Sequence, residues 1–178
     1  MSRQYFADVL IDPNSVALPT ITATSETVLV PTIYTPVAAN EPRAGKIYQL
    51  RVGGTCTTGV AGTLIITPRW GLVIGGVTLG ASPTQNYVPS ITLAPFYFEY
   101  TVVFRTCSMV ATTSTCVGSG FWLSGGAIAT ASSGTQVTCS STASCTVDTT
   151  VASGLWIGVT FSVAPSVIPH WCTWQSLN

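Results

Sequence analysis

Apolar and polar residues alternate with a period of two in much of the chain beyond residue 45. In residues 96–105, FYFEYTVVFR, every second position from Phe96 is aromatic or aliphatic, and the positions between include Glu99 and Arg105. Successive side chains of a strand point to opposite faces of a sheet, so the pattern predicts a strand with one buried face. Residues 155–163 alternate in the same way and predict a second half-buried strand.

Further short segments rich in apolar and β-branched residues are separated by Gly, Pro, Ser and Asn. They lie at residues 46–52, 62–70, 72–79, 120–129, 135–139, 145–151 and 168–177. No segment keeps a helical period of 3.6 residues. Many short strands at close spacing indicate an all-β fold, and we expect an antiparallel β-sandwich that is jelly-roll-like.

The first 44 residues differ from the rest because prolines recur at positions 13, 19, 31, 36 and 42. Such spacing prevents a helix and favours extended geometry. We therefore expect an extended N-terminal arm over residues 1–44 and a β-sandwich domain over residues 45–178. The alternative is that the segment adds a strand or two to the same domain. In the arm, the residues expected to contact another subunit are Val28, Leu29, Val30, Ile33 and Tyr34.

Charge is scarce. Only 7% of the residues are charged, against about 25% in ordinary globular proteins, and six basic and six acidic residues cancel. A neutral chain has no electrostatic footprint for nucleic acid or an anionic membrane surface, so neither is expected as a partner. An apolar surface without charge tends to associate, so the chain is expected to work within an assembly.

Neither a transmembrane helix nor a signal peptide is predicted. No window reaches about 18 uninterrupted apolar residues. Arg3, Asp8 and Asp12 interrupt the N-terminal segment where a signal peptide needs an apolar core. Synthesis in a cytoplasm is the expectation.

Six cysteines lack the spacing of a zinc site or of a C-x-x-C redox motif, so no metal is expected. Local spacing suggests disulfides instead: Cys107 with Cys116, Cys139 with Cys145, and by elimination Cys56 with Cys172. The first two pairs bracket polar loops between predicted strands. Fifteen pairings are possible for six cysteines, and six reduced thiols remain the alternative.

No catalytic constellation is found, and neither enzymatic activity nor a cofactor is expected. The sequence has one histidine, His170, but no nucleophile-elbow motif whose serine it could activate. Nothing in the sequence places two carboxylates together for acid–base catalysis. Glu99 and Arg105 are six residues apart on one strand, so each is expected to meet a neighbouring strand or subunit. Trp156, Trp171 and Trp174 are candidates for stacking on a glycan, although core or interface packing is the commoner role of such rings.

Several segments together resemble a group of tailed-bacteriophage structural proteins. These segments are EPRAGKIYQLRVGGTCTTGVAGTLIITPRWG, TVVFRT, GLWIG and the terminal WQSLN, and the resemblance covers roughly residues 26–178. It implies a β-sandwich component of the virion, a capsid decoration (cement) protein or minor structural protein. The cysteines depart from the pattern of that group.

The resemblance also implies partners and a location. The partners would be the major capsid protein and copies of the chain itself, as a homotrimer on the capsid exterior. The alternatives are a head-fibre or tail-associated protein that binds a host glycan, or a stand-alone carbohydrate-binding module.

Overall fold

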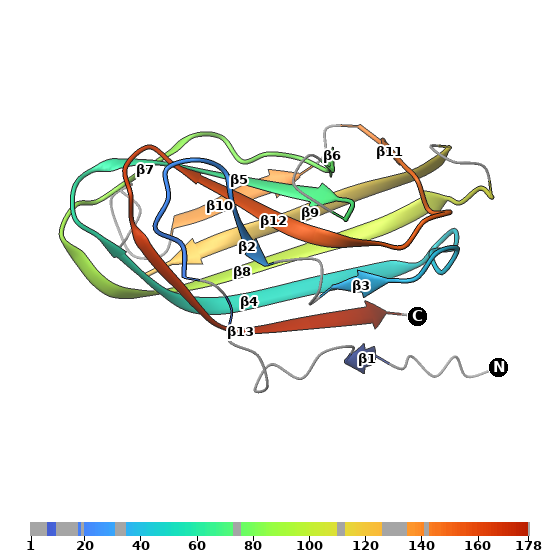
Figure 1. Cartoon of the computed structure of the whole chain (residues 1–178), viewed down its shortest axis with the longest axis horizontal. Helices are drawn as coiled ribbons and strands as arrows, with labels where there is room; N and C mark the ends of the chain where they lie inside the picture. Colours follow the sequence, from blue (N-terminus) through green and yellow to red (C-terminus); the bar gives the residue numbers. More distant parts are fainter. Residues whose placement is uncertain are drawn as a thin grey trace.

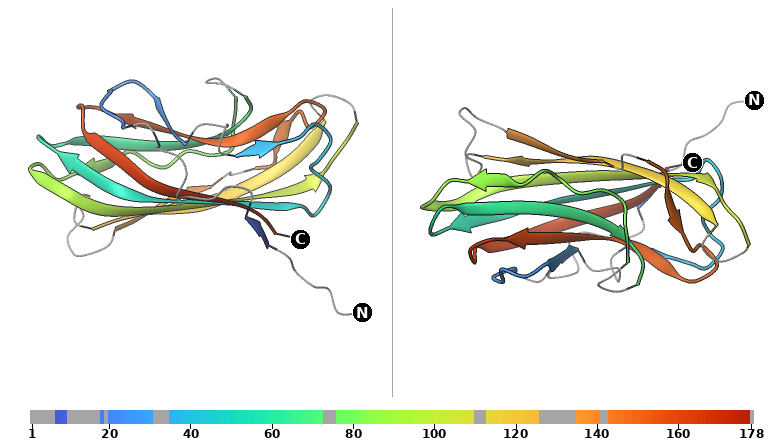
Figure 2. Two further views of the ribbon diagram at one scale, coloured as in Figure 1. Left: turned by 60° about the horizontal axis from the view of Figure 1, so that its bottom comes forward. Right: turned by 90° about the horizontal axis from the view of Figure 1, so that it is seen from above.

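Two antiparallel sheets pack face to face in the computed structural model of the chain (Figures 1 and 2). The structure describes residues 7–9, 18, 20–30, 35–72, 76–109, 113–125, 135–140 and 143–177; for residues 7–9 and 135–140 only the backbone is described. The predicted all-β sandwich is confirmed. Within these ranges no helix is long and apolar enough to cross a membrane.

The larger sheet has seven strands. Their order is β1 (Ala7–Val9), β13 (Ser166–Leu177), β4 (Ile47–Thr58), β8 (Ile91–Thr106), β9 (Ser114–Ser124) and β10 (Thr135–Ser140), and β11 (Cys145–Val147) pairs with β9 beyond β10. The four long strands β13, β4, β8 and β9 lie side by side across most of the molecule (Figure 1).

The smaller sheet has six strands and covers one face of the larger one. Its order is β2 (Thr27–Val30), β12 (Ser153–Phe161), β5 (Gly62–Trp70) and β6 (Val77–Thr78), while β3 (Pro36–Val37) pairs with β12 and β7 (Gln85–Tyr87) pairs with β5. The chain crosses between the sheets from β1 to β2, β3 to β4, β4 to β5, β7 to β8, β11 to β12 and β12 to β13. Segments far apart in the sequence therefore become neighbours.

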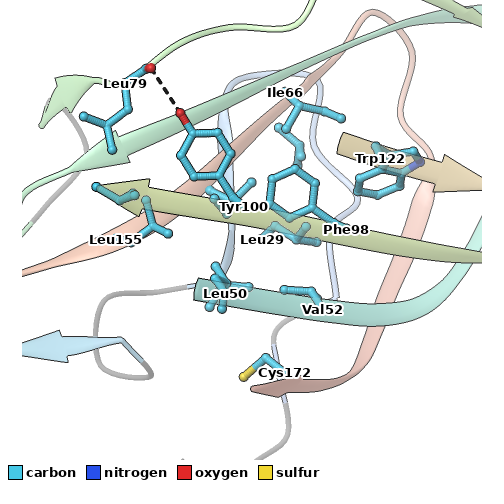
Figure 3. Packing of buried hydrophobic residues seen from close by; sticks show 14 of the residues in the cluster. Leu29, Leu50, Val52, Ile66, Leu79, Phe98, Tyr100, Trp122, Leu155 and Cys172 are labelled. Carbon is cyan, nitrogen blue, oxygen red and sulfur yellow. Dashed lines mark hydrogen bonds between the residues drawn. The ribbon is translucent and has the colours of Figure 1, made fainter. Parts of the chain in front are cut away.

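The alternation predicted for residues 96–105 is confirmed in β8. Phe98 and Tyr100 point into the space between the sheets and are fully buried, as Figure 3 shows. The Tyr100 hydroxyl donates to the carbonyl oxygen of Leu79 at 3.1 Å, which satisfies the polar end of a buried ring. Opposite β8, the register places Leu50 and Val52 of β4 on the same inner face.

The half-buried strand predicted at residues 155–163 is wrong for β12, which is buried on both faces from Ser153 to Val159. This strand lies centrally between β2 and β5. Its outer face is covered as well, because the Arg69 guanidinium lies 5.5 Å from the Trp156 ring. Farther along, the Glu26 carboxylate fills the space over Gly158, where a Cβ would be 2.2 Å from Oε1.

The predicted extended arm is corrected for residues 20–30 and 35–37, which belong to the sandwich. Ile21 forms a bridge to Val167, β2 pairs with β12, and β3 pairs with β12. Leu29 and Val30 are fully buried in their own chain and are not available to a second subunit. Val28 is half-buried in β2, and Ile33 and Tyr34 lie outside the described residues.

Aromatic rings fill the core near the start of β4 and the end of β13. Trp174 is 0% exposed and stacks on Tyr48, with ring centroids 5.2 Å apart and planes 5° apart. Phe104 meets Tyr48 edge-on, and Trp70 of the smaller sheet meets Phe104 edge-on at 5.0 Å. This cluster joins the two layers.

We expect Trp174→Ala to lower the free energy of unfolding by about 3–5 kcal/mol, because it removes a fully buried ring and leaves a cavity beside Tyr48. Trp171→Ala, three residues earlier on the outer face of the same strand, serves as the matched control. Urea unfolding followed by circular dichroism measures both. Equal losses for the two variants would contradict the assignment of Trp174 to the core.

Candidate functional site: the outer face of the larger sheet

The four long strands present a broad outer face, which is turned away from the smaller sheet. Their registers align the outward side chains into four rows across the sheet. In order, the rows are Trp171–Gly53–Tyr97–Leu123, Thr173–Arg51–Glu99–Phe121, Gln175–Gln49–Thr101–Ser119 and Leu177–Ile47–Val103–Val117. We call these sixteen positions the outer face. Apart from Gly53, its end rows are aromatic or aliphatic, and apart from Phe121, its middle rows are polar.

The outer face carries two charges, and they neutralise each other. Arg51 Nε donates to Glu99 Oε2 at 3.0 Å, and Gln49 Nε2 donates to Glu99 Oε1 at 2.9 Å. The Tyr97 hydroxyl donates to the same carboxylate. The prediction that Glu99 meets a neighbouring strand is therefore confirmed.

The Tyr97 hydroxyl holds its proton tightly. Partial burial, followed by the hydrogen bond to Glu99 and the charge of that carboxylate, raises the pKa of Tyr97 to about 12, and Arg51 opposes the rise. A neutral phenol is therefore the form that the folded protein stabilises.

Three half-buried rings gather at one end of the outer face. The centroid of Tyr97 lies 6.0 Å from that of Phe121 and 6.1 Å from that of Trp171, with the planes tilted by 42° and 45°. Gly53 is required beside them, because a Cβ there would be 2.4 Å from the Trp171 ring. The indole thus lies flat across β4. It can offer its other side to a partner surface or to a sugar.

His170 stands next to these rings because of a bulge. The register of β13 with β4 shifts between Pro169 and Trp171, so His170 is the extra residue and its side chain is exposed. Its Nε2 lies 3.1 Å from the Thr55 hydroxyl. Within the described residues no three His, Cys, Asp or Glu side chains are placed to hold a metal ion.

Two of the three predicted glycan platforms are corrected. Trp174 is 0% and Trp156 1% exposed, and a buried ring cannot stack on a ligand. Arg69 covers Trp156 and is itself held by Glu26 through two bonds of 2.8 Å. That carboxylate raises the pKa of Arg69. Trp171 alone of the three lies at the surface.

The cysteine pairings predicted from local spacing do not fit the registers. Cys56, Cys107, Cys116, Cys145 and Cys172 are free thiols in the structure. The residue opposite Cys116 on β8 is Phe104, and Cys107 lies beyond the paired strand ends.

The other two predicted pairs are separated along the ladders. Cys172 is opposite Val52, four residues or about 13 Å from Cys56. Cys139 is opposite Gly120 and Cys145 opposite Cys116, again four residues apart on β9. Cα atoms more than about 7 Å apart cannot be bridged without backbone movement. The Cys139 side chain itself lies outside the described residues.

A shallow pocket of about 500 Å³ lies at the end of the sandwich. It is lined by Asn40, Pro42, Arg43, Ala44, Cys107, Ser108, Met109 and Thr149. Arg43 brings the one charge to this lining. The described lining contains no His, Asp or Glu side chain.

Sequence reasoning found Trp171 but missed Gln49, Arg51 and Phe121. The alternation of apolar and polar residues at 47–52 is a signal that could have placed Gln49 and Arg51 on one face of a strand. What the sequence did not contain was the pairing order of four strands that lie far apart along the chain. Comparisons with protein-family models, with curated proteins and with solved structures found no match to this chain.

Alkaline pH is expected to destabilise the wild type more than Tyr97→Phe. The pKa of Tyr97 is raised in the fold, so its contribution is complete below about pH 10 and is lost as the pH rises toward 12. The variant lacks this loss. Urea unfolding of both proteins at about pH 9 and about pH 11 measures the difference, and parallel behaviour would contradict the Tyr97–Glu99 contact.

Proposed function

We propose that the chain is a non-enzymatic virion structural protein, a decoration protein that binds and stabilises a phage capsid. In this proposal it is made in the host cytoplasm and acts on the capsid exterior, with the major capsid protein and copies of itself as partners. The resemblance of its strand and turn segments to tailed-phage structural proteins supports the proposal. The observation that carries it is the outer face.

The outer face has the character of an interface core. Such cores are depleted of charge and enriched in aromatic residues. Here fourteen of the sixteen positions are uncharged, and Arg51 and Glu99 already neutralise each other. Desolvating this face therefore leaves no unpaired charge behind, which is the costly outcome when charged surfaces are buried.

Neighbouring copies of the chain in a trimer are the occupants that the proposal assigns to this face. The composition supports this, because the chain as a whole has a net charge of zero and copies do not repel one another. A β-sandwich with one low-charge face buried between copies leaves its loops to contact the shell. Met109 and Leu93, 87% and 59% exposed, are large apolar side chains on such loops or strand ends.

The purified protein is expected to have a native mass of three times its 18.6 kDa chain. Phe121→Glu places an unpaired carboxylate on the outer face and should weaken association at least about 100-fold. Ile65→Glu, a half-buried aliphatic position on the outer side of β5, is the matched control and should remain trimeric. Light scattering after size exclusion measures all three proteins. A monomeric wild type, or equal effects of both variants, would contradict the assignment of this face.

Glycan binding is the second candidate, and the cluster of Trp171, Tyr97 and Phe121 favours it. Sugar rings stack on aromatic faces while their hydroxyls bond to neighbouring polar groups, and Glu99 in the row of Phe121 and Gln49 in the next row supply such groups.

A host cell-wall polysaccharide should then change the tryptophan fluorescence of the wild type in a saturable way. In isothermal titration calorimetry, which does not depend on the indole signal, Trp171→Ala should abolish binding, whereas Trp171→Phe should retain part of it because an aromatic face remains. A monomeric protein with this response would favour the glycan-binding function. A trimer without it would favour the capsid function.

A further inference from the structure

Two cysteines are directly opposite each other where β11 begins. The register of β11 with β9 pairs Cys145 with Cys116, followed by Thr146 with Thr115 and Val147 with Ser114. Val147 and Ser114 are 1% and 0% exposed and point inward. Side chains two residues apart on a strand share a face, so Cys145 and Cys116 also point inward and lie side by side on that face.

This placement suits a disulfide. Residues directly opposite in an antiparallel pair have Cβ atoms about 4.5–5.5 Å apart, close to the 3.5–4.5 Å that a disulfide needs. The sulfurs are not bonded in the structure. Instead the Cys145 thiol points to the carbonyl oxygens of Thr78 and Ala143, at 3.5 and 3.8 Å. A thiol is a weak donor, so leaving these carbonyls costs little.

We propose that Cys116 and Cys145 form a cross-strand disulfide when the folded protein meets a small-molecule disulfide of the glutathione class. The bond would close a loop that contains all of β10, the last strand along that edge of the larger sheet. Oxidation would therefore clamp this edge. The inference does not depend on the proposed function.

The reaction proceeds by two thiol–disulfide exchanges. The thiolate of Cys145, the half-buried member of the pair, attacks one sulfur of the small disulfide and releases one small thiolate, which takes up a proton. The thiolate of Cys116 then attacks the Cys145 sulfur and releases the second small thiol. The two protein thiols lose two electrons and two protons, and the small disulfide gains both.

Burial makes the reduced pair slow to react. It raises the pKa of Cys145, and it raises the pKa of Cys116 to about 12, with further contributions from the neighbouring Cys145 and Cys107. The thiolate is the attacking species, so the oxidation rate should increase with pH. A reducing cytoplasm would thus leave the pair reduced, and exposure to an oxidising exterior would convert it gradually.

Cys107 is the third thiol near this pair and the natural competitor. It lines the pocket at the end of the sandwich and is half-buried. It comes after a register irregularity between Phe104 and Thr106, and no strand residue is paired with it. Cys145 is therefore the better placed partner for Cys116.

The test oxidises the folded full-length protein with oxidised glutathione and identifies the linked fragments by mass spectrometry without reduction. Digestion with trypsin and chymotrypsin places Cys107 and Cys116 in fragment 106–121, and Cys139 and Cys145 in fragment 124–155. Two double variants resolve the remaining ambiguity. Cys107→Ser with Cys139→Ser leaves only Cys116 and Cys145 in these fragments. Cys107→Ser with Cys145→Ser leaves Cys116 and Cys139.

The first double variant should link the two fragments with a loss of about 2 Da, and the second should not. The oxidised first variant should also melt roughly 5–10 °C above its reduced form, because a long loop is closed. Near-UV circular dichroism confirms that each variant is folded before oxidation. A link in the second variant, a Cys107–Cys116 bond in the wild type, or free Cys116 and Cys145 after full oxidation would overturn the proposal.

Discussion

The antiparallel register that β13, β4, β8 and β9 keep across the four rows of the outer face is the constraint on which the other features depend. Because side chains alternate along a strand, this register decides at once which residues form the core and which form the outer face. A slip of one residue between β4 and β8 would expose Leu50 and Val52 and bury Arg51. The Arg51–Glu99 pair and the Phe98 and Tyr100 rings thus oppose the same error from opposite sides of the sheet.

Several of the few charged side chains of this protein join neighbouring segments of the fold. Glu26 and Arg69 join the segment before β2 to the outer side of β5 and cover Trp156. Glu41 accepts hydrogen bonds from the Tyr48 hydroxyl and from the backbone of Ala38, which ties the segment before β4 to the aromatic cluster. Burial and this contact raise the pKa of Tyr48. Glu26 and Glu41 therefore have structural partners, as Glu99 does, and these three carboxylates add little unpaired charge to oppose contact between surfaces.

The sequence predicted β8 correctly from its alternation, whereas it predicted β9 (Ser114–Ser124) only from residue 120 onward. The alternation in residues 96–105 was sufficient because the outward residues of β8 are at most half-buried among the segments that the structure describes. In β12 the same pattern gave a wrong prediction. The Glu26 and Arg69 side chains cover the face that the period of two indicates as exposed. The prediction that Trp156 stacks on a glycan is wrong for a related reason: Trp156 occupies an outward position but lies beneath Arg69. Cysteine spacing failed because β10 and β11 follow one another along β9, so residues close in sequence are separated along the ladder.

The arrangement of β10 and β11 along β9, which made the predicted cysteine pairs wrong, also links the outer face to the cysteine pair. β9 carries Phe121 and Leu123 on the outer face and Cys116 on the inner one. Its far edge is covered by β10 and β11, which are short and belong to one excursion of the chain between β9 and β12. Short, separately paired strands are the weakest cover for a sheet edge, since each contributes few backbone hydrogen bonds. A covalent link between Cys116 and Cys145 would act at the junction of the two, where the backbone ladder is interrupted. It would hold the edge of the sheet whose outer face is proposed to bind a second copy.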